Sequence, residues 1–176
     1  GDGVLTSNGI TTLNANANAD TFTVAGGTLT VNGALTNNSA AINVDAGTLA
    51  ADGTIAAASI DVAQGATLTT EEAERLNGGV ALTNDGTVSL GGNETIGDLS
   101  GAGTITNNGN DLAVTQTSDQ TFSGTLSGAG GLTKQGEATL TLSNGSSFTG
   151  DANVNEGTLT VSGALATDTI NVATGC

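Results

Sequence analysis

The chain offers few side chains that could carry out catalysis. It contains no histidine, its only cations are Arg75 and Lys134, and its single cysteine is Cys176. A serine or cysteine nucleophile needs a base, most often histidine, so Lys134 is the only side chain that could activate a serine. Zinc sites draw mainly on cysteine and histidine. We therefore predict no catalytic residue, no cofactor-binding residue and no metal ligand.

Carboxylates are the remaining candidates for chemistry. Asp45, Asp61 and Asp85 recur at similar positions along the chain and could stack on one face. Two carboxyl groups about 5–9 Å apart would suit glycoside hydrolysis. Sugar-binding sites usually present aromatic side chains, however, and the chain has neither tryptophan nor tyrosine. We expect a protein that is not an enzyme, and keep a polysaccharide-acting β-helix as a lesser alternative.

Calcium is the metal that an acidic repeat protein would bind most readily. Some β-rolls hold it through Gly-Gly-x-Gly-x-Asp repeats. The nearest approaches here are Gly-Gly-Asn-Glu at residues 91–94 and Gly97-Asp98, and neither fits that pattern. The spacing of an EF-hand is also missing. No dedicated calcium site is expected.

The net charge excludes two classes of partner. The formal charge is -15, from 17 acidic residues against two basic ones. Binding to a nucleic-acid backbone requires Lys and Arg, and anionic membrane surfaces also attract basic segments. No apolar run reaches the length that spans a bilayer. We expect no nucleic-acid partner and no direct membrane insertion by this segment.

The elements that would position any functional residue repeat along the chain. The phrase Gly/Ala-Thr-Leu/Ile/Val recurs at a nearly constant step, and the shortest step is the one from Thr125 to Thr139. The mean step of about 19 residues suits one coil of a solenoid. The threonines of the phrase are Thr28, Thr48, Thr67, Thr87, Thr104, Thr125, Thr139 and Thr158.

Strands and corners can be assigned within each coil. Thr28-Leu29-Thr30-Val31 alternates polar and apolar side chains, as a half-buried strand does. Glycine tolerates the positive φ of a sharp corner. The predicted corner glycines are Gly27, Gly47, Gly65, Gly157 and Gly175.

These features predict an all-β parallel β-helix of about nine coils, with residues 1–176 forming a single segment. The regular step with a constant residue order argues against the rival β-sandwich. One apolar residue per coil should point inward and stack into a ladder. The predicted ladder is Leu29, Leu49, Leu68, Val88, Ile105, Leu126, Leu140 and Leu159.

One stretch departs from the strand pattern. Residues 69–77 contain three of the six glutamates of the chain. Thr69 and Glu72 have the spacing of a capping box, and Glu71 and Arg75 form an i,i+4 pair that favours a helix. A short helical excursion is predicted here, acting as a local cover for the core or, less favoured, as a docking feature.

The C-terminal half resembles a known family. Residues 128–143 read Gly-Ala-Gly-Gly-Leu-Thr-Lys-Gln-Gly-Glu-Ala-Thr-Leu-Thr-Leu-Ser, and Phe-Thr-Gly at 148–150 and Val-Asn-Glu-Gly-Thr-Leu at 154–159 follow. This resembles the autotransporter-associated β-strand repeat of bacterial passenger domains, most clearly over residues 96–163. The resemblance implies a right-handed β-helix at a bacterial cell surface, anchored to the outer membrane outside this segment. It carries no catalytic site, and it makes Lys134 part of the repeat's own motif.

Three functions are compatible with the sequence. The leading hypothesis is a stalk and adhesion surface that contacts a host, matrix or sister-cell ligand. The second is assembly of copies through their open coil ends, with Cys176 as a candidate cross-link. The third is ice binding, which is less favoured because the Thr-x-Thr pairs do not fall on consecutive coils. These pairs are Thr28-Thr30, Thr67-Thr69, Thr139-Thr141 and Thr158-Thr160.

Overall fold

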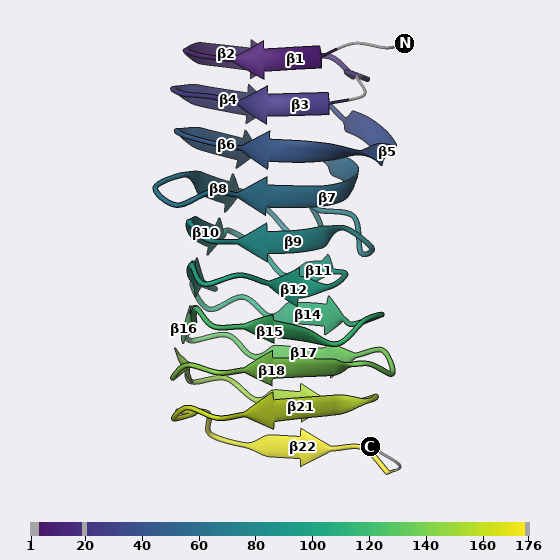
Figure 1. The fold of residues 1–176 in the computed structure, drawn as a ribbon, viewed down its shortest axis with the longest axis vertical. Helices are drawn as coiled ribbons and strands as arrows, with labels where there is room; N and C mark the ends of the chain where they lie inside the picture. Colours follow the sequence, from purple (N-terminus) through teal and green to yellow (C-terminus); the bar gives the residue numbers. More distant parts are fainter. Residues whose placement is uncertain (1–3, 19–20, 175–176) are drawn as a thin grey trace.

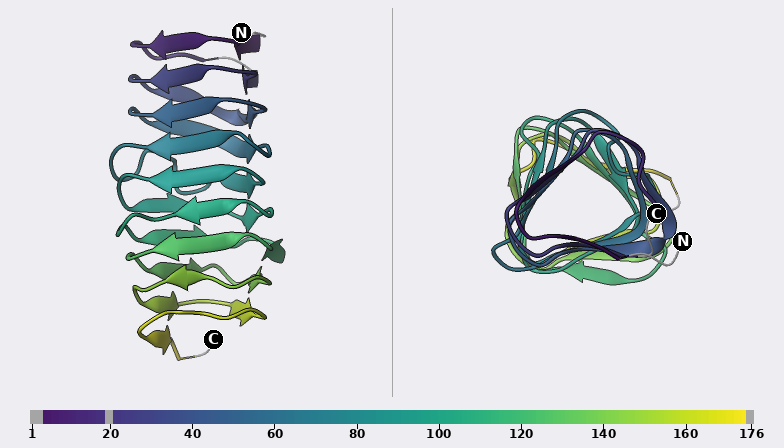
Figure 2. Two further views of the ribbon diagram at one scale, coloured as in Figure 1. Left: turned by 90° about the vertical axis from the view of Figure 1, so that its left-hand side faces the viewer. Right: turned by 90° about the horizontal axis from the view of Figure 1, so that it is seen from above.

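The computed structural model describes residues 4–18 and 21–174, and every regular element within them is a β-strand. Parallel strands stack along one axis in about eight turns and form a rod (Figure 1). Seen along that axis, the turns superpose on a triangular outline (Figure 2). The prediction of an all-β parallel β-helix is confirmed.

The first side of the triangle is the six-stranded sheet, in the order β1-β3-β5-β7-β9-β12. The three-stranded sheet β15-β18-β21 continues it, and a parallel bridge between Gly101 and Phe122 joins the two sheets. The bounds are β1 Val4–Ser7, β3 Thr21–Val24, β5 Leu35–Val44, β7 Ile55–Val62, β9 Ala81–Asn84, β12 Leu99–Ser100, β15 Gln120–Phe122, β18 Thr139–Leu142 and β21 Thr158–Val161.

The second side is the eight-stranded sheet, which runs almost the whole length of the rod in the order β2-β4-β6-β8-β10-β13-β16-β19. The bounds are β2 Ile10–Leu13, β4 Thr28–Val31, β6 Thr48–Ala51, β8 Thr67–Thr70, β10 Thr87–Leu90, β13 Thr104–Thr106, β16 Thr125–Gly128 and β19 Ser147–Phe148.

The third side is built in two parts. Its early turns use the first halves of β5 and β7, where Leu35 pairs with Ile55, and a bridge then joins Ile55 to Leu76. Its later turns form the five-stranded sheet β11-β14-β17-β20-β22. The bounds are β11 Glu94–Ile96, β14 Leu112–Thr115, β17 Leu132–Gln135, β20 Ala152–Val154 and β22 Ile170–Val172.

Inward side chains alternate with outward ones and fill the narrow interior with stacked aliphatic groups. The first six residues of the predicted ladder lie in one row of the eight-stranded sheet. Leu140 and Leu159 instead stack on each other in the three-stranded sheet. The predicted single ladder is therefore wrong for these two residues, because they lie on a different side of the triangle.

The division of the ladder has a simple cause in the repeat length. The step from Thr125 to Thr139 is the shortest between successive copies of the phrase, and it is less than one turn. The phrase thus moves from the second side to the first at this point, so counting phrases overestimates turns. The structure accordingly has about eight turns where nine were expected.

The predicted helical excursion at residues 69–77 is wrong, because the described residues contain no helix. Thr69 and Thr70 stay extended and pair with β10, while Leu76 pairs with Ile55. Only a short loop is left between them, and Glu74 within it has a φ of 53°. Tertiary pairing on both sides of this loop outweighs the local helix signals, since so short a helix is marginal on its own.

Four of the predicted corner glycines, Gly27, Gly47, Gly65 and Gly157, have positive φ. Gly47 also has a steric requirement, because a Cβ there would lie 2.2 Å from the carbonyl oxygen of Gly27 in the preceding turn. Corners of successive turns thus stack backbone against backbone. The fifth predicted corner, Gly175, lies outside the described residues.

Candidate functional site

The outward face of the eight-stranded sheet carries two unbroken rows of small side chains over six consecutive turns. We call these two rows the threonine face. The first row consists of Thr28, Thr48, Thr67, Thr87, Thr104 and Thr125, and the second of Thr30, Ala50, Thr69, Ser89, Thr106 and Ser127. No register shift interrupts these six strands.

Most hydroxyl groups of the threonine face are free to bind partners outside the protein. Within the face, the Thr125 hydroxyl donates to that of Thr104 at 3.5 Å, the Ser127 hydroxyl donates to a backbone carbonyl, and Ser89 accepts from an asparagine side chain. Among these described residues, seven further hydroxyls make no hydrogen bond within the protein: those of Thr28, Thr30, Thr48, Thr67, Thr69, Thr87 and Thr106.

The threonine face is uncharged, although the chain is strongly acidic. Of the 17 acidic residues, Asp2 and Asp20 lie outside the described part. Of the other 15, only Asp61 and Glu94 lie within strands. Asp61 is on the first side and Glu94 on the third, so negative charge gathers at the corners and loops of the rod.

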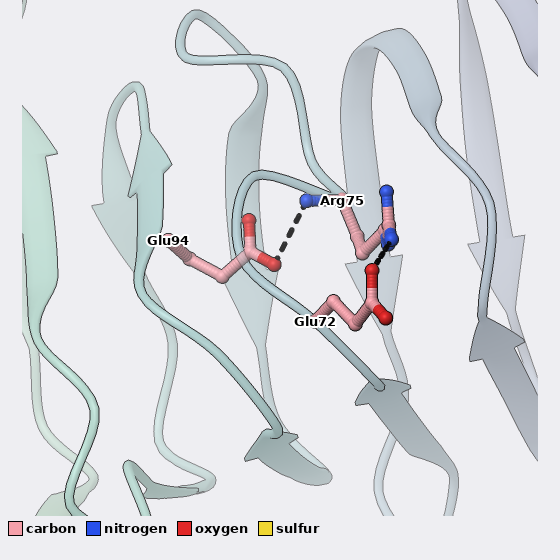
Figure 3. Close-up of polar contacts among 3 residues, drawn as sticks. All are labelled: Glu72, Arg75 and Glu94. Carbon is pink, nitrogen blue, oxygen red and sulfur yellow. Dashed lines mark hydrogen bonds and ion pairs between the residues drawn. The ribbon is translucent and has the colours of Figure 1, made fainter.

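Glu94 is a buried carboxylate in the third side, at a position where neighbouring turns carry aliphatic residues. Only 1 % of its surface is exposed, and it pairs with Leu112 in the next turn. Its carboxylate oxygens accept hydrogen bonds from the backbone N–H groups of Arg75 and Leu76, each at 3.0 Å. Figure 3 shows the bond from Arg75. The strand ladder is broken at this point, because the carbonyl of Asn93 accepts from Glu74 instead. The carboxylate therefore replaces the missing acceptors.

Burial raises the pKa of Glu94 above its ordinary value, because a charged carboxylate is poorly solvated inside the rod. The N–H groups of Leu76 and Arg75 and the Thr70 hydroxyl oppose this rise, and the nearby Glu74 carboxylate adds to it. The Arg75 guanidinium points the other way and forms an ion pair with Glu72 (Figure 3). Glu94 is thus held by backbone dipoles and a hydroxyl rather than by a cation.

Lys134 is the second buried charge of the third side. It is fully buried, and its Nζ donates to the carbonyl oxygens of Gln135 and Gly136 at 2.7 Å each and of Glu156 at 3.2 Å. These carbonyls belong to the corners of two successive turns. A Lys134 ammonium bound in this way cannot act as the base of a serine nucleophile, and it joins the two turns instead.

The three aspartates considered for glycoside hydrolysis do not stack in one row. Asp61 lies in a strand, where it stacks on Asn43 and Thr83. Asp45 and Asp85 follow the ends of strands two turns apart, with Ala63 at the equivalent position between them. Asp85 is also engaged, because its carboxylate accepts the N–H of Ala102 at 2.9 Å, beside a shallow pocket lined by Ala63 and Gln64.

The oxygen atoms nearest to a calcium pattern are occupied by protein donors. Asn93 accepts the backbone N–H of Asp111 through its side chain. Asp98 accepts hydrogen bonds from the N–H and hydroxyl groups of Thr117 and Ser118 in the next turn. Burial raises the pKa of Asp98, but these bonds outweigh it and hold the pKa below its ordinary value. No cluster of three or more metal-binding side chains occurs among residues 4–18 and 21–174.

Sequence reasoning missed the continuity of the threonine face and the burial of Glu94. Continuity could have been found by admitting Ala and Ser beside Thr, since Ala50, Ser89 and Ser127 complete the second row. The burial of Glu94 has no comparable signal, because it follows from the loop in the preceding turn. The candidate cross-link Cys176 lies outside the described residues.

Comparison with known proteins adds a family match. Residues 132–161 match the family model of the passenger-associated-transport-repeat. No curated protein and no solved structure gives a significant match. The repeat and the β-solenoid together fit the repeat domain of an autotransporter passenger, which suggests a surface-exposed or secreted protein. The described strands and loops include no helix of membrane-crossing length and hydropathy.

Proposed function

We propose that this chain is a non-enzymatic stalk and adhesion segment of a bacterial passenger protein. The observation that carries the proposal is the continuous threonine face on a rod of stacked turns. Such a rod presents the same weakly binding groups many times at fixed spacing. Many weak contacts made together give strong attachment without any single strong site. The partner would be a ligand on a host cell, in the matrix or on a sister cell.

The distribution of charge supports this assignment of the binding surface. Acidic side chains gather at the corners and loops, so a strongly acidic ligand would be repelled there. The threonine face is the neutral surface through which a neutral, hydroxyl-rich partner could approach. The proposal that the chain has no enzymatic activity is supported by the engagement of Asp85 with the N–H of Ala102, by the absence of a common row for Asp45, Asp61 and Asp85, and by the burial of Lys134.

Attachment should depend on the threonine face and not on the first side of the rod. The test variant is Thr67→Lys with Thr87→Lys, two stacked residues of which one is half-buried and one exposed. The matched control is Thr141→Lys with Thr121→Lys, which have the same exposures in the three-stranded sheet. Purified protein would be bound to cells, matrix proteins and a glycan array. Loss of binding in the first pair alone supports the proposal, and equal binding by all three proteins contradicts it.

End-to-end assembly is the second candidate function, and the last turn favours it. Ile170 and Val172 are each 60 % exposed, whereas Ala152 and Val154, their partners in the preceding turn, are buried. A further turn, from a continuation of the same chain or from another copy, would cover them. Electron microscopy across a salt series tests this, because salt screens the repulsion between acidic copies. Filaments at high salt support assembly, and single rods at every salt concentration contradict it.

A further inference from the structure

Ice binding is disfavoured by the sequence because the Thr-x-Thr pairs are interrupted, but the structure shows a surface without that interruption. Thr-x-Thr pairs alone are interrupted, but the register places a threonine of the first row on each of six consecutive turns. Thr104 and Thr106 add a pair within this run. Where the second row lacks threonine, it has alanine or serine, which are no larger. The surface is therefore a continuous array rather than scattered pairs.

The array is regular in two directions. Neighbouring turns are about 4.8 Å apart along the rod, and residues two apart in a strand are separated by roughly 6.6 Å. Each threonine has a β-branched side chain with a restricted χ1 angle. Beneath the first and second rows lies the buried row that includes Leu49, Leu68 and Val88, which are at most 1 % exposed. Hydroxyl and methyl groups are thus held in place from below.

We propose that the threonine face binds the surface of ice. Ice is a neutral solid that repeats hydrogen-bonding groups in two dimensions. Unpartnered hydroxyls such as those of Thr48, Thr67 and Thr87 can bond to its water molecules. The methyl groups between them exclude mobile water and favour an ordered layer. This activity goes beyond adhesion to cells or matrix and does not depend on it.

Ice fits this surface better than a soluble ligand does. Strong protein partners usually bury an aromatic or arginine anchor, and the threonine face has neither. The three phenylalanines of the chain are at most 1 % exposed. Without an anchor, one small contact area gives little affinity. An extended solid can engage all six turns at once, and this sum of weak contacts is what an unanchored array requires.

Ice-affinity purification of the intact chain tests the proposal. The wild-type protein should be enriched in slowly grown ice and should slow the recrystallisation of fine ice. Thr67→Lys with Thr87→Lys should lower the ice-bound fraction about tenfold, because two long charged side chains would hold the face away from the crystal. Thr121→Lys with Thr141→Lys, on another side of the rod, should retain wild-type enrichment.

Circular dichroism and thermal unfolding would first establish that both double variants are folded. Wild-type exclusion from ice overturns the proposal, and so does equal enrichment of the wild-type protein and the Thr67/Thr87 variant. A comparable loss in the Thr121/Thr141 variant also overturns it, since the effect would then lie outside the threonine face. The binding assay on cells and matrix uses no ice, so its failure is separate from failure here.

Discussion

Glu94 and Lys134 are two buried charges on the same side of the rod, and they bind opposite kinds of backbone group. Glu94 accepts from two backbone N–H groups where the strand ladder is interrupted. Lys134 donates to three backbone carbonyls where two corners converge. Neither is neutralised by a direct ion pair with the other, since each contacts backbone groups of its own region. The sign of each buried charge matches the backbone groups that would otherwise lack a partner.

The comparison shows how a solenoid tolerates irregular turns. A regular turn satisfies its N–H and C=O groups through the turns above and below. A loop such as residues 71–75 or a tight corner such as that at Gly136 breaks this exchange. A single charged side chain then restores it and also ties two turns together: Glu94 does so from the adjoining turn, and Lys134 from the strand that leads into the corner. Glu94 and Lys134 thus supply hydrogen bonds that the backbone ladder lacks at these two points.

Replacing Lys134 with methionine should have the largest effect on stability. Lys134→Met keeps the length of the side chain but removes all three hydrogen bonds to carbonyls. Hydrogen bonds to charged groups contribute about 1.5–3 kcal/mol each, and water can replace some of them at a corner. We expect the free energy of unfolding to fall by about 2–4 kcal/mol, measured by urea denaturation.

Thr133→Met is the matched control for this change, because Thr133 points outward from the same strand. It should alter the free energy of unfolding by about 0.5 kcal/mol or less. Wild-type stability in Lys134→Met would show that the corner carbonyls do not need the ammonium, and the parallel with Glu94 would then fail.

Glu94→Leu should destabilise the rod by a smaller amount. Leucine suits the apolar row, since Leu112 and Leu132 follow in the next turns. It leaves the N–H groups of Arg75 and Leu76 without acceptors, at a cost of about 1–3 kcal/mol each. Relief from burying the carboxylate offsets part of this cost, so we expect a net loss of about 1–3 kcal/mol.

Glu94→Gln sharpens the same test, because the amide keeps one acceptor oxygen. Its stability should lie between those of the wild type and Glu94→Leu. Hydrogen exchange should show faster exchange at Arg75 and Leu76 in both variants, while amides around Lys134 remain protected. A Glu94→Leu protein more stable than the wild type would mean that burying the carboxylate costs more than its hydrogen bonds contribute.

The pH dependence should separate Glu94 from Asp98. The pKa of Glu94 is raised by folding, so its contribution to stability is present below the ordinary value of 4.5 and is lost as the pH rises through the folded pKa. The pKa of Asp98 is lowered, so its contribution is present above 3.8 and is lost as the pH falls through the folded pKa. Urea midpoints would be measured from acidic to neutral pH. The deficit of Glu94→Gln should be larger in acid, and that of Asp98→Asn larger at neutral pH; parallel curves would contradict both assignments.

Much of the fold could be predicted from the sequence, because each turn repeats the same alternation of Thr and aliphatic residues. The six residues from Leu29 to Leu126 were placed in one row by spacing alone. The prediction is wrong at Leu140 because the short step from Thr125 to Thr139 is less than a full turn. A repeat phrase indicates a strand and a corner, but only the summed length of all segments in a turn decides which side it occupies.

The candidate site was less predictable than the fold, because it depends on contacts between residues that lie a full turn apart in the sequence. A hydroxyl array depends on register between strands that lie a full turn apart in the sequence, and the interruption at Ala50 masked it. The role of Glu94 depends on a loop that lies one turn earlier. Thr69 and Glu72 do have the spacing of a helix cap. Strand pairing with neighbouring turns nevertheless keeps this stretch from forming a helix.

Ser146 completes the comparison as a buried polar group that lacks the partners Glu94 and Lys134 have. It is 3 % exposed, its hydroxyl has no hydrogen-bond partner, and it follows Leu126 in the inward row of the second side. A buried hydroxyl without a partner destabilises the folded state. Ser146→Ala should therefore raise the free energy of unfolding by about 1 kcal/mol, measured by urea denaturation. Ser147→Ala, at the exposed neighbouring position, should change it little. A loss of stability in Ser146→Ala would mean that the Ser146 hydroxyl is itself satisfied, and the rule that buried polar groups here serve the backbone ladder would then extend to the second side.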